Sequence, residues 1–211
     1  MLAVSFSAAS LPAQTTFYSN LGTSGDLYNS GEGWTISGTF GGGEQSIGTA
    51  FTPMSSGNIS EIDIGVGYSF GTNSFYAALY TDNNGALGTQ LGQWNNLSST
   101  QSFGGCCGLV SITGITGIDL TSGEQYFLVL GPTDPNGNTS EAWYYNNTGA
   151  QDTQLSSHDG GATWTNNGDQ VMGAFDVLGG PGGTTPEPSS LILLGTGLLG
   201  ASATLRRKIG L

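Results

Sequence analysis

The stretch Ile59-Ser-Glu-Ile-Asp-Ile-Gly-Val66 indicates most directly how this chain folds. Its isoleucine and valine residues nearly alternate with serine, acidic residues and glycine. Successive side chains of a β-strand point to opposite faces of the sheet, so the pattern predicts a strand with one buried face and one acidic face. A second layer must cover the buried face, which favours a layered antiparallel β structure.

The rest of the body repeats this theme in short apolar runs separated by Gly- and Asn-rich turns. No segment before residue 189 keeps the 3.6-residue apolar period of a helix. The sequence therefore predicts an all-β fold, an antiparallel β-sandwich of jelly-roll type, over residues 14–178. The predicted strands lie at 33–37, 46–52, 59–67, 74–81, 90–97, 109–113, 125–130, 142–146 and 172–178.

The charges are divided very unevenly along the chain. The formal net charge is -12, and the only cations besides the single histidine are Arg206, Arg207 and Lys208. The body before them therefore has acidic side chains and no permanent cation. Nothing in it could neutralise phosphates, which excludes nucleic acid as a partner and makes anionic substrates unsuitable. Folding must depend on apolar burial and backbone hydrogen bonds instead of ion pairs.

An uncharged segment, residues 189–205, comes directly before the basic triplet. As a helix it would be about 25 Å long, at the short limit for crossing a bilayer core of about 30 Å. Basic residues that flank such a segment stay on the cytoplasmic side, so the body is expected to be exported. An ordinary single-pass anchor and a removable sorting signal are both compatible with these properties.

The order of the tail motifs resembles the PEP-CTERM sorting signal. Pro186, Glu187 and Pro188 precede the apolar helix, and the basic triplet follows it, so the resemblance covers residues 186–208. It implies a membrane-embedded exosortase as partner, which recognises the Pro-Glu-Pro region. The protein would cross the inner membrane once before processing. Its body would then pass to the cell envelope, the surface or an exopolysaccharide matrix.

The two ends of the body are expected to be connecting or processed segments. Residues 1–13 have an apolar stretch and a small residue, Ala13, before Gln14, as in a signal peptide. They lack the usual basic start, so either the signal is truncated or the segment is not a signal peptide, and the expected export of the body favours the first. Residues 179–185, rich in glycine, are predicted to form a flexible linker to the tail.

The body also resembles the choice-of-anchor R type of bacterial surface domain. The likeness spans most of residues 17–179 and implies a surface location and a β fold, without an assigned activity. Its motifs include 45–52, 75–85, 120–129 and 159–164.

Cys106 and Cys107 are adjacent within a Gly-rich segment, 103–108. Either two thiols or a strained vicinal disulfide would fit there. A zinc site would need further ligands, and His158 is the only histidine.

Three kinds of ligand site are candidates. Asx-rich turns could offer oxygens to Ca²⁺ as a cofactor, and aromatic side chains could stack on sugar rings of a glycan. Glu61 and Asp63 share a strand face at a spacing compatible with a glycosidase pair, but a solvated acidic face explains them without any catalytic chemistry and is the preferred interpretation. The calcium candidates are Asp82, Asn84, Asp134 and Asn136, and the glycan candidates are Trp143, Tyr144, Tyr145 and Trp164.

These observations favour an exported structural or adhesive protein of the cell surface or matrix that is not an enzyme. The first alternative is a carbohydrate-binding module for exopolysaccharide, and the second is an acidic glycan hydrolase.

Overall fold

A computed structural model describes residues 14–180 of the protein, and within them the fold is all-β. One short 3₁₀-helix, η1, is the only helical element of this range, and every ladder between named strands is antiparallel. The elements are β1 Thr15–Ser19, β2 Asn29–Ser37, η1 Thr39–Gly41, β3 Ser46–Phe51, β4 Gly57–Ile64, β5 Val66–Phe70, β6 Phe75–Asp82, β7 Leu87–Leu97, β8 Val110–Thr113, β9 Asp119–Leu120, β10 Tyr126–Pro132, β11 Ser140–Tyr145, β12 Gln151–Ser157, β13 Thr165–Val171 and β14 Phe175–Gly179.

A six-stranded sheet with the order β13-β12-β3-β10-β6-β7 forms one layer. Its central strand, β10, is buried on both faces. Leu128 and Leu130 belong to the main core, whereas Phe127 and Val129 pack into a second cluster on the opposite face of the sheet. Strands that are buried on both faces have continuous apolar runs, as β10 does.

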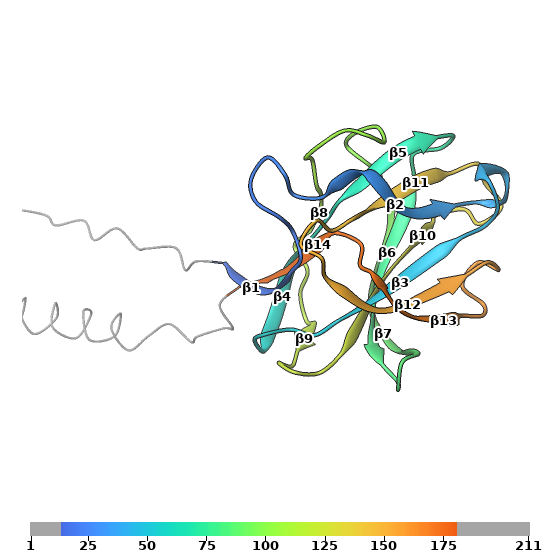
Figure 1. Ribbon diagram of the computed structural model, residues 1–211. Helices are drawn as coiled ribbons and strands as arrows, with labels where there is room; N and C mark the ends of the chain where they lie inside the picture. The colour runs from blue at the N-terminus through green and yellow to red at the C-terminus, as the bar shows by residue number, and fades with distance from the viewer. Residues whose placement is uncertain (1–13, 181–211) are drawn as a thin grey trace, which may run out of the picture.

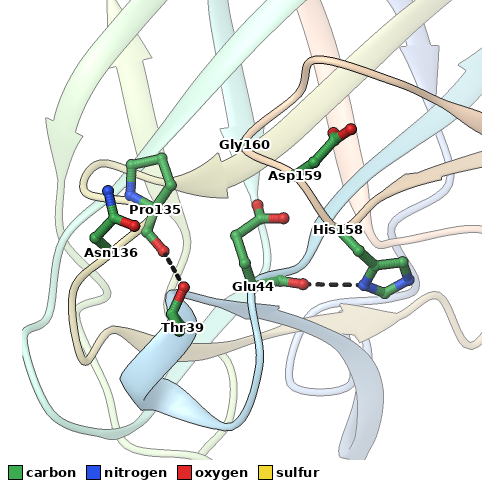
Figure 2. A pocket seen from close by; sticks show the side chains of 7 residues that line it. All are labelled: Thr39, Glu44, Pro135, Asn136, His158, Asp159 and Gly160. Carbon is green, nitrogen blue, oxygen red and sulfur yellow. Dashed lines mark hydrogen bonds between the residues drawn. The ribbon is translucent and has the colours of Figure 1, made fainter.

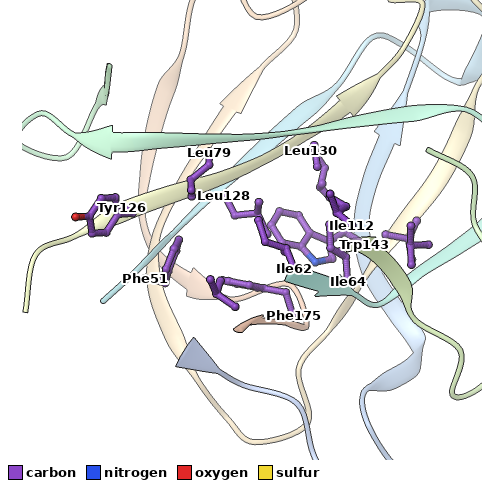
Figure 3. Packing of buried hydrophobic residues seen from close by; sticks show 14 of the residues in the cluster. Phe51, Ile62, Ile64, Leu79, Ile112, Tyr126, Leu128, Leu130, Trp143 and Phe175 are labelled. Carbon is purple, nitrogen blue, oxygen red and sulfur yellow. The ribbon is translucent and has the colours of Figure 1, made fainter. Parts of the chain in front are cut away.

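Two smaller sheets supply the other side of the main core. One has the order β1-β14-β4-β8, with β9 added to β4, and the other has the order β2-β11-β5. Ile62 of β4, Phe175 of β14 and Trp143 of β11 meet Leu128 of the six-stranded sheet between the layers (Figure 3). The all-β and sandwich-like predictions are therefore confirmed, while the jelly-roll connectivity stays a prediction.

The predicted strand at 59–67 is in fact two strands, and this part of the prediction is wrong. β4 ends at Ile64 and β5 begins at Val66, because the chain passes from one small sheet to the other at Gly65. The Gly65 amide donates to the carbonyl of Ala174, and a Cβ at this position would lie 2.8 Å from the Tyr28 ring. Only glycine allows the ring to pack this closely against the backbone.

Most open edges of the sheets carry irregularities in register in place of the lysines that often protect an edge, although β8 pairs with β4 in regular register. The register of β7 on β6 shifts at three places, and β1, β2 and β13 each show one shift against their neighbours. The edge of β5 is covered by a parallel bridge between Tyr68 and Ser102. These features interrupt the rows of free backbone groups onto which another chain could pair.

The first and last strands of the body lie side by side. β1 pairs with β14, and Thr15 is opposite Gly179. In Figure 1 both ends of the described chain therefore leave on the same side, while the β2–β3 connection lies on the opposite side. Between residues 14 and 180 the chain contains no helix that is long and apolar enough to span a bilayer. The predicted helix at 189–205, the signal peptide at 1–13 and most of the linker lie outside the described residues.

Candidate functional site

A polar cleft of about 430 Å³ opens between three connections of the sandwich (Figure 2). These are the β2–β3 segment with η1, the β10–β11 loop and the β12–β13 loop. The lining residues are Thr39, Glu44, Pro135, Asn136, His158, Asp159 and Gly160.

Backbone hydrogen bonds fix the first two connections against each other. The amide of Thr39 donates to the carbonyl of Pro135 at 2.8 Å, and the amide of Phe40 donates to that of Gly137 at 2.9 Å. Within the β10–β11 loop, Asp134 accepts from the amide of Asn136 at 3.0 Å. An aspartate that accepts from the amide two residues ahead is a common way to stabilise a turn. This wall of the cleft is therefore preformed.

Asp159 organises the β12–β13 loop. One carboxylate oxygen accepts from the Ser157 hydroxyl at 2.8 Å and from the Thr163 amide at 2.9 Å, and the other accepts from the Thr163 hydroxyl at 2.6 Å. These hydrogen bonds to the charged form, led by the one from the Thr163 hydroxyl, lower the pKa of Asp159 to about 2. The side chain is thus an ionised acceptor at any ordinary pH and is unsuited to act as a general acid.

His158 and Glu44 join the third connection to the first. Nδ1 of His158 lies 2.9 Å from the carbonyl oxygen of Glu44, so this nitrogen carries a proton that it donates. The Glu44 carboxylate accepts from the Ser46 hydroxyl at 3.1 Å, while its Oε2 is buried without a hydrogen-bond partner among the described residues. Within residues 14–180, the cleft lining includes two carboxylates and no lysine or arginine, so it suits a neutral ligand with hydrogen-bond donors, such as the hydroxyls of a glycan.

None of the predicted site residues except Asn136 lines this cleft, and sequence reasoning missed Glu44 and Asp159 as site residues. Three segments far apart in the chain supply the lining, and only tertiary pairing brings them together. In the sequence, the one feature that these three segments share is a turn containing Gly, Asn or Asp, and this feature does not indicate that they meet.

The four calcium candidates fall on two separate turns. Asp82 accepts from the amides of Asn84 at 3.1 Å and Gly85 at 2.7 Å, which closes the β6–β7 turn. Asp134 comes just after the opposite end of the β6–β10 ladder, where Pro132 pairs with Phe75. The two turns are therefore at opposite ends of these strands. Asp82 also lines a small pocket of about 120 Å³ with Glu124. Within residues 14–180 no group of three or more His, Cys, Asp or Glu side chains could hold a metal.

Two of the four glycan candidates are inaccessible. Trp143 points into the main core and Tyr144 points to the opposite face of β11, and both are 0% exposed. Tyr144 is covered because its ring stacks between Tyr28, at 4.7 Å, and Phe103, at 5.8 Å. A buried ring cannot stack on a sugar, whereas Tyr145 and Trp164 are partly exposed.

The acidic pair proposed from the sequence acquires a third member. Glu61 and Asp63 lie on β4, and Asp176 of β14 is directly opposite Asp63. Burial, followed by the charge of Asp63, raises the pKa of Asp176 to about 7. Among the described residues, one oxygen of Asp63 and one of Asp176 are buried without a partner. The pair lies on a strand face outside the cleft described above.

Cys106 and Cys107 form a disulfide, and the peptide bond between them is cis. Cys107 Sγ accepts a hydrogen bond from the amide of Leu27 at 3.5 Å. The vicinal disulfide therefore lies in the loop that covers Tyr28 and Tyr144.

Comparisons with known proteins identify a family motif in one part of the chain. The family model for the PEP-CTERM protein-sorting motif matches residues 184–208. This range contains Pro186, Glu187, Pro188, the uncharged segment and the basic triplet, so the predicted sorting signal is confirmed. The motif implies an exported substrate that passes the membrane and is processed by an exosortase.

Neither a curated protein nor a solved structure matches the chain. The likeness of the body to the choice-of-anchor R domain stays a prediction.

Proposed function

We propose that the protein is an exported, non-catalytic component of the cell surface or extracellular matrix with a structural or adhesive role. The observation that carries the proposal is the pairing of β1 with β14 in a chain that ends in a sorting motif. This pairing brings both ends of the body to one edge of one sheet. The β2–β3 connection on the opposite side can then face outward from the tether (Figure 1).

The intact mass of the protein from envelope and medium fractions of its native host tests the sorting step. We expect the mature protein to lack the segment after Pro188, and Glu187→Ala to retain Arg206, Arg207 and Lys208. Glu124→Gln, an exposed acidic position in the body, is the matched control and should be processed normally. A wild-type mass that still contains the basic triplet would instead identify a simple membrane-anchored protein.

A second candidate function is binding of the producer's exopolysaccharide. It is favoured by Trp164, which lies beside the polar cleft. The indole Nε1 donates to the carbonyl of Gly161 at 3.1 Å, next to Gly160 in the cleft wall. A partly exposed ring held in this way can stack on a sugar while the cleft accepts hydrogen bonds from its hydroxyls.

Calorimetric titration with the host polysaccharide tests this second function. We expect Trp164→Ala to weaken binding about tenfold or more, equivalent to about 1.4 kcal/mol, because it removes the stacking surface. Tyr145→Ala, at the other partly exposed aromatic candidate, should leave affinity unchanged if the cleft is the site. Equal losses in both variants would assign binding elsewhere.

A further inference from the structure

The stretch of chain that contains β5 differs from the rest of this acidic protein because it carries almost no charge. From Ile64 to Ile118 the only charged residue is Asp82, although Glu141 of the neighbouring strand β11 pairs with Tyr68. Within this region two exposed segments, residues 69–72 and 102–106, contain two of the large apolar side chains most exposed to solvent. Phe70 is 53% exposed and Phe103 is 45% exposed. We call these two segments the Phe70–Phe103 face.

Backbone pairing places the two segments next to each other. The Tyr68 amide donates to the Gln101 carbonyl at 2.9 Å, and the Phe103 amide donates to the Tyr68 carbonyl at 2.7 Å. Phe70 pairs with Ser140 on β11, at a point where the register of β5 on β11 shifts, and Phe103 stacks on Tyr144 of the same strand. Both phenylalanines therefore lie on neighbouring exposed segments beside β11.

Phe103 is held rigidly although it is exposed. Its ring stacks on Tyr144, whose hydroxyl donates to the carbonyl of Ser102 at 3.1 Å. The same loop is fixed further on by the Tyr28 hydroxyl, which donates to the carbonyl of Gly108 at 2.9 Å. An ordered exposed aromatic ring loses little conformational entropy on association, as at the energetic centres of protein interfaces.

We propose that the Phe70–Phe103 face is a self-association surface that binds the same face of a second copy of this chain. A two-fold contact brings identical surfaces together, and the acidic parts of the body, which have no lysine or arginine to offset them, would repel one another. The two segments of the face carry no charge themselves, which lessens this repulsion at the contact. The irregular edges of β1, β2, β7 and β13 disfavour pairing of strands between copies at those four edges, which favours contact through a face.

Sedimentation equilibrium of the full chain in detergent, over a wide range of concentration, tests the proposal. We expect a reversible dimer whose dissociation constant decreases when salt rises from about 0.05 M to about 0.5 M, because salt screens the repulsion between the two acidic bodies. Phe103→Ser and Phe70→Ser should each weaken the dimer about tenfold or more. The matched control is Phe40→Ser, at an exposed phenylalanine on η1 (78% exposed), and it should leave the dimer unchanged.

Three results would overturn the proposal. The first is a monomer at every concentration, and the second is a Phe40→Ser variant that weakens the dimer as much as the other two. The third is a dimer that neither Phe103→Ser nor Phe70→Ser weakens, which would assign association to another part such as the tail. Thermal melting checks that each variant is folded. If Phe103→Ser is unfolded, Phe70→Ser alone decides, because its ring has no stacking partner among the described aromatic pairs.

Discussion

Changing Asn146 to aspartate is expected to lower the free energy of unfolding by about 3 to 5 kcal/mol at neutral pH. Asn146 is 5% exposed, and its amide nitrogen donates to the carbonyls of Ala150 at 2.9 Å and Met172 at 2.8 Å. Its oxygen accepts from the amides of Thr148 at 3.2 Å and Ala150 at 2.9 Å. Aspartate has the same shape, yet it would direct a buried negative charge at two carbonyl oxygens.

Chemical denaturation of the wild type and the variant measures this effect. Protonation gives the aspartate one donor, so we expect the loss to shrink as pH falls to about 3. Asn83→Asp, at an exposed turn position, adds the same charge and should change stability by less than about 0.5 kcal/mol. A loss below about 1 kcal/mol for Asn146→Asp would show that these hydrogen bonds are not critical.

Asn146 also illustrates which features the sequence could not reveal. The irregular segment between β13 and β14 crosses from the large sheet to a small one, so only an isolated bridge between Tyr145 and Gly173 and a few backbone hydrogen bonds hold it, and it also takes side-chain partners. Asn146 and the buried Asn20 supply them: Asn20 donates to the carbonyl of Gly173 and accepts from the amide of Phe175, both at 2.8 Å. Asparagine in a sequence ordinarily indicates a turn, and nothing local distinguishes these two residues.

Strands with alternating or continuous apolar residues were predictable. The structure has strands close to the predicted ranges 46–52, 74–81, 109–113 and 125–130. β12 and β13 were missed because their residues, Gln151–Ser157 and Thr165–Val171, are mostly polar and show no apolar period. They are strands because β12 pairs with β3 and β13 pairs with β12. These pairings use backbone groups, which leave no signal in the sequence.

The sorting motif could be predicted from the sequence, whereas the candidate site could not. The motif is a linear order of residue types over 184–208, so reading the sequence was sufficient to find it. The cleft combines Glu44 with Asp159, and the acidic group on β4 and β14 adds Asp176 to Glu61 and Asp63. Each combination depends on strand pairing across more than a hundred residues, and a single sequence does not contain that information.

The most informative titratable group of the fold is Glu141, a carboxyl group in the interior. It is 1% exposed and lies on β11 between Ile36 and Tyr68 of the neighbouring strands. Both of its oxygens are buried without a hydrogen-bond partner among the described residues. Burial disfavours the charged form and raises the pKa of Glu141 to about 8.

This shift determines how stability depends on pH. Between the ordinary pKa of 4.5 and about 8, the folded protein keeps a proton on Glu141 that the unfolded chain has released. Rising pH therefore favours unfolding across this window, and the stability present below pH 4.5 is lost as pH passes through 8. The raised pKa of Asp176 acts in the same direction, so the protein should be most stable in mildly acidic solution.

Glu141→Met is accordingly expected to stabilise the protein at pH 9 by on the order of 3 kcal/mol and to remove most of the decline between pH 5 and 9. Methionine fills a similar volume and has no group that ionises. The variant therefore carries no charge in the apolar interior at high pH. Urea denaturation at a series of pH values measures the difference, with Glu124→Met, an exposed position, as the control that should keep the wild-type profile. If Glu141→Met retained the wild-type decline, the proton would be held elsewhere, and Asp176→Asn would be the variant to identify where.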